Sequence, residues 1–317
     1  MVGKLVRRIL CIDGGGIKGT LPASFLSTVE EATGERIVDH FDLIAGTSTG
    51  GIIALGLGLG FGATEIKEFY ENEGPSIFAT FGFFASVRHV TKAKYDPTPL
   101  RKALHKIFAE RRLGESATRL LIPAFNSTTG RVHIFKTSHH PRFEIDYQSR
   151  AVDVVLATAA APTYFPAHQI DLGSYLVDGG VWAKNPAGLA AVEAVGVLGW
   201  QPAETRMLSL SCSGVPLDVP AAAGWATMNK GLLSLFSEGQ SSAALGTAKI
   251  LLGHSDVAPR LFRIDPIVAN GTFSLDDAGK LKHLIGLGST SARDFLPTFR
   301  AVFLGEKREA FEPCHRA

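Results

Sequence analysis

Short apolar runs, typical of buried strands, alternate along the chain with longer stretches of helical periodicity. The strand pattern occurs in segments 7–12, 41–46, 119–126, 131–137, 174–180, 206–212 and 260–265. The helical pattern occurs in segments 21–33, 50–60, 64–74, 151–161, 186–198 and 222–253, and in a stretch that ends near residue 303. This alternation predicts an α/β protein with a mostly parallel central sheet covered by helices on both faces.

The domain organisation follows from the same pattern. Thr64 is in position to cap the helix 64–74. No repeat and no long linker interrupts the alternation, so we expect a single domain over residues 1–317. Within it, a core of about residues 5–215 precedes a helical part of about residues 216–305, which is followed by a frayed tail.

The composition narrows the class of protein. Hydrophobic residues make up 45% of the chain and charged residues 20%, which suits a large core and excludes a disordered chain. The net charge of +2 lacks the dense basic stripe of nucleic-acid-binding proteins, so no nucleic-acid polymer is expected as a partner. The three cysteines, Cys11, Cys212 and Cys314, have no zinc-site spacing. We therefore expect no metal, and we expect Cys11 and Cys212 to be buried free thiols.

Two hydrophobic stretches resemble targeting signals but fail their criteria. The apolar run near the N-terminus breaks at Asp13, too soon for a signal peptide. Three hydroxyl residues and seven glycines interrupt residues 43–63, so no membrane span is predicted there. A cytoplasmic protein is the expectation.

Residues 46–50, Gly-Thr-Ser-Thr-Gly, match the pattern G-x-S-x-G between a predicted strand and a predicted helix. On such a sharp turn, Gly46 and Gly50 would leave the hydroxyl of Ser48 exposed, and the first helical amides could stabilise negative charge. The alternative is that the glycines only allow the helix to pack closely on the strand. The position between strand and helix favours Ser48 as a nucleophile.

A second glycine-rich turn, residues 13–19, fits the dinucleotide-binding pattern G-x-G-x-x-G. An NAD site also needs an acidic residue at the tip of a second strand. The candidate acids lie instead in the region of a predicted helix: Glu30, Glu31 and Glu35. A phosphate-binding P-loop is excluded as well, because Thr20 stands where that loop needs a lysine.

The same turn can serve as an oxyanion site. The three successive glycines, Gly14, Gly15 and Gly16, offer N–H groups that no side chain obstructs. Lys18 would add positive charge nearby, and the N–H of Thr49 could join the donors. This interpretation is favoured over the cofactor site, so no cofactor is expected.

A serine nucleophile needs a base within hydrogen-bond reach. His254 and His283 are late enough in the chain, but neither lies beside a glycine-rich strand end. Asp178 closes a predicted strand, and Gly179 and Gly180 leave room around its carboxylate. An ordinary aspartate pKa is too low for this task, so the site would have to be dry enough to raise it. The alternative for Asp178 is a simple Asp-Gly turn.

The three motifs D-G-G-G-I-K-G, G-T-S-T-G and D-G-G, in this order at strand ends, resemble those of the patatin-like phospholipase family. The segment A-P-T-Y-F-P at 161–166 looks like the family's segment ahead of its acidic motif, and the resemblance spans at least residues 7–186. It implies a three-layer α/β/α sandwich that hydrolyses acyl esters of glycerolipids without a metal. It also implies a catalytic dyad of Ser48 and Asp178, with the oxyanion loop at residues 14–16.

Segments 42–60, 135–142 and 180–190 are more similar to the bacterial patatin effectors of cyclic-oligonucleotide (CBASS) anti-phage systems than to plant storage patatins. That similarity implies an enzyme that stays idle until a cyclic dinucleotide binds. It would then degrade phospholipid at the inner face of the cell membrane.

Two basic regions are candidate contact sites. One loop could hold the phosphates of a messenger, or be merely solvated, through Lys136, His139, His140 and Arg142. Segment 77–94 combines aromatic and cationic residues that suit an anionic bilayer: Phe78, Phe81, Phe83, Phe84, Arg88, Lys92 and Lys94. The alternative is that these phenylalanines are buried in the core or in a homodimer interface.

Overall fold

The computed structural model describes residues 6–78, 93–170, 173–214, 232–269 and 271–316. Its strands are β1 (Arg7–Ile12), β2 (Leu43–Gly46), β3 (Arg119–Asn126), β4 (Arg131–Lys136), β5 (His168–Gln169), β6 (Tyr175–Asp178), β7 (Thr205–Leu210) and β8 (Leu261–Ile264). Its α-helices are α1 (Thr20–Thr33), α2 (Thr49–Gly58), α3 (Ala63–Ile77), α5 (Thr98–Phe108), α6 (Ala151–Thr158), α7 (Gly180–Ala183), α8 (Ala187–Val192), α10 (Leu232–Leu252) and α11 (Leu281–Val302). A π-helical turn, Glu193–Val197, continues α8.

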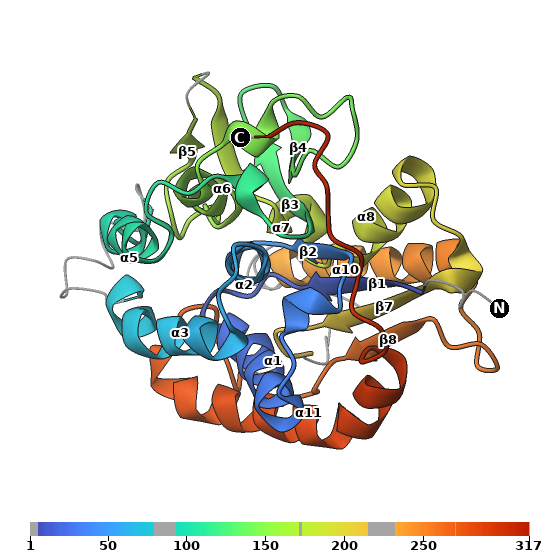
Figure 1. Ribbon diagram of the computed structural model, residues 1–317. Coiled ribbons are helices and arrows are strands. Elements are labelled where there is room, and N and C mark those ends of the chain that lie inside the picture. The colour runs from blue at the N-terminus through green and yellow to red at the C-terminus, as the bar shows by residue number, and fades with distance from the viewer. Residues whose placement is uncertain (1–5, 79–92, 171–172, 215–231, 270, 317) are drawn as a thin grey trace.

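One sheet of eight strands forms the centre of the molecule (Figure 1). Its order is β5-β6-β3-β2-β1-β7-β8, and β4 pairs with β3 outside this path. The pairs among β3, β2, β1, β7 and β8 are parallel, whereas β4, β5 and β6 join in antiparallel pairs. The prediction of a mostly parallel sheet is therefore confirmed.

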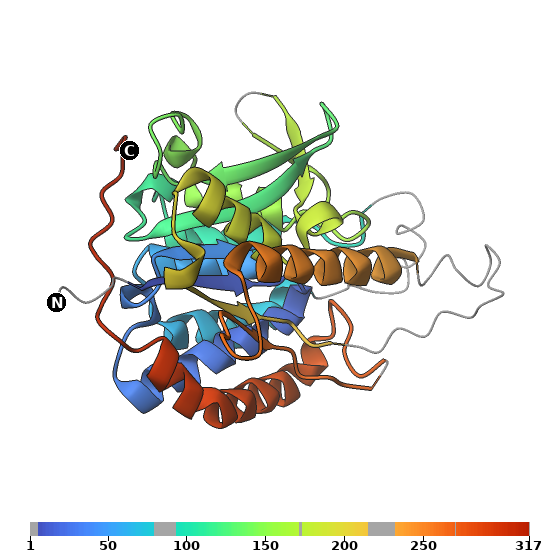
Figure 2. The ribbon, with the colours of Figure 1, turned by 90° about the vertical axis from the view of Figure 1, so that its right-hand side faces the viewer.

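The central strands β1, β2, β3 and β7 bury both of their faces, which explains why they appear in the sequence as continuous apolar runs. On β1, Leu10 and Ile12 belong to the core cluster formed with α1, α2 and α3, and the end of α11 closes it through Phe299. Ile9 and Cys11 point the other way, into the cluster formed with α8 and α10. Figures 1 and 2 show these two helical layers on opposite sides of the sheet, as the three-layer prediction requires.

The strand register brings two turns that are distant in sequence to the same level of the sheet. Ala45 on β2 pairs with Leu121 on β3, and Ala124 on β3 pairs with Asp178 on β6. Three residues beyond the first pair, Ser48 therefore reaches the level of Ala124 and Asp178. Because β6 runs antiparallel to β3, its last residue lies beside the turn that follows β2.

Some element boundaries differ from the predictions. Thr64 is not the cap of its helix, because α3 begins at Ala63 and the N–H of Gly62 is bound by the Glu65 carboxylate at 2.7 Å. Helix α5 was not predicted, although its sequence is amphipathic, with a proline in the first turn and Leu100, Leu104 and Phe108 on the buried face. The predicted helix 222–253 is described only from residue 232, where α10 begins.

The C-terminal tail is docked rather than frayed, contrary to the prediction. The N–H of Arg308 donates to the carbonyl of Asp39 at 2.8 Å, and the N–H of Cys314 donates to the carbonyl of Ser138 at 2.6 Å. Figure 1 shows the tail rising past the sheet to β4. Backbone pairing of this kind leaves no pattern of hydrophobic positions in the sequence.

The cysteine prediction is confirmed for Cys11 and Cys212, which are buried free thiols, and Cys314 is exposed. Burial raises the pKa of Cys212 to about 12, so this thiol stays protonated at neutral pH. Among the helices of the described segments, none is both long and apolar enough to traverse a bilayer.

Candidate active site

Ser48 occupies a strained turn between β2 and α2. Its backbone lies at φ 55° and ψ −118°, a conformation that side-chain-bearing residues rarely adopt. The two flanking glycines are required by space. A Cβ on Gly46 would lie 2.0 Å from the carbonyl oxygen of Gly50, and one on Gly50 would lie 2.2 Å from that of Ile12. The G-x-S-x-G pattern therefore has a steric origin here.

Thr158, at the end of α6, fixes this turn. Its hydroxyl accepts the backbone N–H of Ser48 at 3.0 Å and donates to the carbonyl of Pro123 at 2.6 Å. Its own carbonyl accepts the N–H of Gly179 at 3.3 Å, next to Asp178. One buried threonine thus contacts both the serine turn and the aspartate turn. A polar residue that follows an apolar run at the end of a buried helix must be hydrogen-bonded, which is the signal in the sequence that could have identified Thr158.

The Asp178 carboxylate lies near the Ser48 hydroxyl, which acts to lower the pKa of the carboxylate. The carboxylate accepts the N–H of Gly180 at 2.6 Å, and Asp178 is only 5% exposed. Gly179 must lack a side chain, because a Cβ would lie 2.2 Å from the carbonyl oxygen of Pro123. Burial raises the pKa of Asp178 to about 6, although the Ser48 hydroxyl and the N–H of Gly180 act in the opposite direction. A carboxylate with this pKa can accept a proton near neutral pH.

The glycine loop after β1 faces the serine turn. A Cβ on Gly14 would stand 3.3 Å from the Cβ of Ser48. The sequence predicted that the N–H of Gly14 is a free donor for an oxyanion. It donates instead to the carbonyl of Lys184 at 2.9 Å. The backbone N–H groups of Gly15, Gly16 and Thr49 have no hydrogen-bond partner among the described residues.

Side chains and backbone from distant segments hold this loop. Asp13 immediately precedes the glycines, and Arg263 on β8 forms a bidentate ion pair with it, at 3.0 and 2.7 Å. Gly16 has φ +58°, and a Cβ there would lie 2.1 Å from the carbonyl oxygen of Leu275. That carbonyl accepts the N–H of Ile17 at 2.8 Å. Lys18 is partly buried, and burial lowers its pKa.

Residues 10–191 match the model of the family described as "Patatin-like phospholipase". The chain belongs to the patatin-like phospholipase family. The match contains the glycine loop, the serine turn and the aspartate turn.

The chain is also similar to individual known proteins. A Pseudomonas aeruginosa protein named "cGAMP-activated phospholipase" is 33% identical over 302 residues, which cover 88% of each chain. A Vibrio cholerae protein of the same name is 38% identical over 196 residues, covering 57% of this chain and 55% of that protein. The crystal structure of VipD from Legionella pneumophila aligns at 13% identity and a TM-score of 0.49, over 92% of this chain and 67% of VipD.

The residues considered for other chemistries have structural roles in this patatin-like phospholipase. Glu30 accepts the N–H groups of Ile37 and Ala63, at 2.8 and 2.7 Å. His254 accepts two backbone N–H groups at its Nδ1 atom, and His283 packs edge-on against Phe273. None of these contacts involves Ser48. Within the described segments, no group of three histidine, cysteine or acidic side chains could hold a metal ion.

Two of the residues expected to bind phosphate are bound to an acidic partner. The carboxylate of Glu193 contacts the Nζ atom of Lys136 at 2.6 Å and the Nε2 atom of His139 at 3.0 Å. The Glu193 side chain is almost completely buried. Burial raises the pKa of Glu193, but the hydrogen bonds from His139 and Lys136 outweigh it and hold the pKa below its ordinary value. Burial lowers the pKa of His139. Lys136 therefore forms an ion pair with Glu193, and His139 hydrogen-bonds to the same carboxylate, which charge counting along a loop could not reveal.

The other residues predicted to contact a messenger or a membrane differ in their surroundings. Arg142 is exposed and lies over the ring of Phe143, as the neighbouring ring of His140 does. Phe78 packs against Tyr95 rather than facing a membrane. Lys94 pairs with Asp276, so it is not a free cation for lipid either. The remaining predicted membrane contacts lie outside the described residues and stay predictions: Phe81, Phe83, Phe84, Arg88 and Lys92.

Replacing Thr158 with valine tests its role as a positioning residue. The near-isosteric change leaves the N–H of Ser48 and the carbonyl of Pro123 without their partner, so we expect a stability loss of about 2 kcal/mol or more. Because the serine turn would shift, kcat should fall about 10- to 100-fold with little change in KM. Thr158→Ser, which keeps the hydroxyl, should restore kcat. A destabilised Thr158→Val enzyme with unchanged kcat would limit Thr158 to a structural role.

Proposed function

We propose that this chain is a serine lipid acyl hydrolase in which Ser48 and Asp178 form the catalytic dyad. The observation that carries the proposal is the position of the Ser48 turn at the level of the buried Asp178 carboxylate, whose pKa burial raises to about 6. The strained φ of Ser48 supports it, because backbone strain of this kind is concentrated at functional sites.

In the first half of the reaction, the Asp178 carboxylate takes the hydroxyl proton while Ser48 Oγ bonds to the ester carbonyl carbon. The carbonyl oxygen becomes an oxyanion, and we expect it to be held by the N–H groups of Gly15, Gly16 and Thr49, which have no hydrogen-bond partner among the described residues. The intermediate collapses by breaking the bond to the alcohol oxygen. That alcohol leaves as the lysolipid and takes the proton back from Asp178.

In the second half, a water molecule gives its proton to Asp178 and bonds to the acyl carbon. The second oxyanion occupies the same donors, and its collapse breaks the bond to Ser48 Oγ. The serine regains its proton from Asp178 and the fatty acid departs. A single carboxylate thus acts as base and then as acid in each half, so a histidine is not needed.

We further propose that the substrates are membrane glycerophospholipids and that a cyclic dinucleotide activates the enzyme. Three relatives carry the name "cGAMP-activated phospholipase", and one of them aligns over 88% of its length. An enzyme of this kind acts from the cytoplasm on the inner face of the membrane.

The test is to incubate the purified protein with mixed phospholipid vesicles, with and without cyclic GMP–AMP, and to weigh the products by mass spectrometry. We expect fatty acid and lysophospholipid in equal amounts, released faster when the nucleotide is present. Equal rates with and without the nucleotide would indicate a constitutive lipase. The absence of both products under every condition would overturn the hydrolase.

A further inference from the structure

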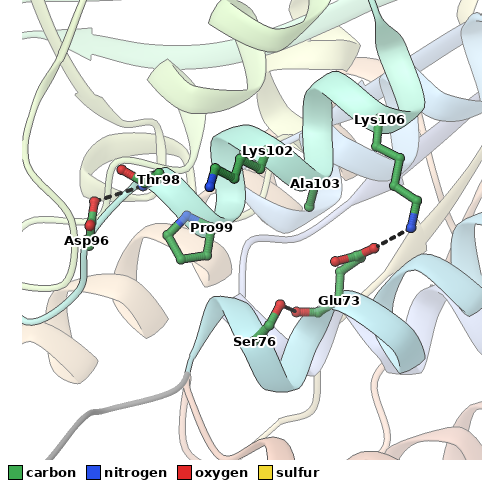
Figure 3. A pocket seen from close by; sticks show the side chains of 8 residues that line it. All are labelled: Glu73, Ser76, Asp96, Thr98, Pro99, Lys102, Ala103 and Lys106. Carbon is green, nitrogen blue, oxygen red and sulfur yellow. Dashed lines mark hydrogen bonds and ion pairs between the residues drawn. The ribbon is translucent and has the colours of Figure 1, made fainter.

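An open cleft of about 450 Å³ lies between α3 and α5, and its lining residues do not overlap with the Ser48 site. Its volume is within the range of small-molecule sites, roughly 300–1,000 Å³. Figure 3 shows Glu73 and Ser76 on α3 facing Thr98, Lys102 and Lys106 on α5. The cleft is therefore lined from two helices by cations, hydroxyls and carboxylates.

The charges of this cleft match a nucleotide better than a simpler anion. Lys102 and Lys106 are four residues apart on α5, so they share one face and can each meet a phosphate. Lys106 pairs with Glu73 at 3.0 Å, whereas no acidic side chain in the described segments pairs with Lys102. The carboxylates of Glu73 and Asp96 would repel a bare phosphate but can accept N–H groups from base edges.

Helix α3 connects the cleft to both catalytic loops. The hydroxyl of Tyr70 donates to the carbonyl of Thr49 at 2.9 Å, directly after the nucleophile. Gly74 packs on Ile17 of the glycine loop so closely that a Cβ would lie 2.6 Å from its Cδ1 atom. Glu73, which lines the cleft, is the residue before Gly74. A displacement of α3 by a ligand would thus be felt at the serine turn and at the oxyanion donors.

A second connection runs from the base of the cleft. Asp96 follows Tyr95, whose hydroxyl donates to Asp276 at 2.7 Å, and Lys94 binds the same carboxylate oxygen. The carbonyl of Leu275, next to Asp276, accepts a hydrogen bond from the N–H of Ile17. The glycine loop is therefore held by the chain segments on both sides of the cleft.

We propose that the cleft between α3 and α5 binds the activating cyclic dinucleotide, and that α3 and the Tyr95–Asp276 contact transmit its effect to the glycine loop. This inference rests on the proposed function, because it gives the messenger a site. Lys102 and Lys106 bind the phosphates, and Glu73 binds a base edge. By reciprocity, occupancy of the lipid site tightens nucleotide binding.

The test measures binding of cyclic GMP–AMP to the full chain by calorimetry. Lys102→Glu reverses the unpaired charge, and we expect it to raise Kd at least about tenfold. Arg101→Glu is the matched control, because it makes the same change one position earlier on α5 without lining the cleft. It should leave Kd within about twofold and basal hydrolysis unchanged. Thermal unfolding of each variant checks that it is folded.

The outcomes separate this site from the proposed function. Unchanged Kd in folded Lys102→Glu, with normal binding by the unaltered protein, would overturn the site alone. Failure of the unaltered protein to bind the nucleotide would overturn messenger control, and the site with it. Normal binding without any lipid hydrolysis would instead overturn the hydrolase and leave the site standing.

Hydrogen exchange on the unaltered protein tests the connection. We expect cyclic GMP–AMP to slow exchange in residues 69–77 of α3 and in the glycine loop, residues 13–19. Slower exchange confined to α5 would overturn the transmission through α3.

Discussion

Replacing Ser48 with alanine is expected to lower kcat for ester hydrolysis by about 10⁶-fold, as removal of a serine nucleophile does in other hydrolases. The reason is chemical rather than structural, because alanine has no oxygen to form the acyl-enzyme and changes little else in the packing. Single-turnover release of fatty acid from phospholipid vesicles and from a soluble short-chain ester provides the measurement. Both substrates should fail together, since both need the same nucleophile.

The chain offers a matched control for this change. Ser213 is also buried, also has positive φ, at 101°, and its hydroxyl has no hydrogen-bond partner among the described residues. Ser213→Ala should retain full activity. If the two alanine variants lost activity equally, or if Ser48→Ala kept more than about 1% of kcat, Ser48 would not be the nucleophile.

The sequence was most informative where a local steric rule operates. Gly46, Gly50 and Gly179 stand where a Cβ would collide with backbone, so the motifs around Ser48 and Asp178 are visible in the chain itself. Strands buried on both faces give continuous apolar runs, which is why the parallel sheet could be predicted. Both signals are visible as residue types within one short segment, although the backbone that a Cβ on Gly50 or Gly179 would meet belongs to the distant residues Ile12 and Pro123.

The sequence was least informative where the partner comes from far along the chain. Lys136 looked like a free cation, yet its partner Glu193 lies 57 residues away. Arg263, which holds Asp13 at the start of the glycine loop, is separated from it by 250 residues. The N–H of Gly14 was predicted to be an oxyanion donor, but it donates to the backbone carbonyl of Lys184. Such pairings depend on the tertiary structure and leave no spacing to recognise.

Asp178→Asn is expected to abolish catalysis and to stabilise the protein at the same time. Asparagine can still accept the N–H of Gly180 but cannot take a proton, so kcat should fall about 10⁴-fold. In the unaltered enzyme, kcat/KM should fall about tenfold per pH unit below pH 6, because the pKa of Asp178 is about 6 and only the carboxylate is a base. Retention of activity by the variant would reduce Asp178 to a turn residue.

The pH dependence of stability provides the sharper test. The carboxyl group of Asp178 keeps its proton up to about pH 6 when folded, since burial raises its pKa, whereas an unfolded aspartate releases it near pH 4. As the pH rises from 4 to 6, the unaltered protein therefore loses stability relative to Asp178→Asn, by on the order of 3 kcal/mol above pH 6. The Tm of the variant should exceed that of the unaltered protein at pH 8, and the two values should converge at pH 4.

Asp277→Asn is the matched control for both measurements, because Asp277 also accepts the N–H of a glycine two residues later. It should leave kcat unchanged and show no such gain in Tm at pH 8. A Tm difference between Asp178→Asn and the unaltered protein that stays constant from pH 4 to pH 8 would contradict the raised pKa. The buried carboxylate would then lack the property that lets it act as the base, and the dyad would lose its physical ground.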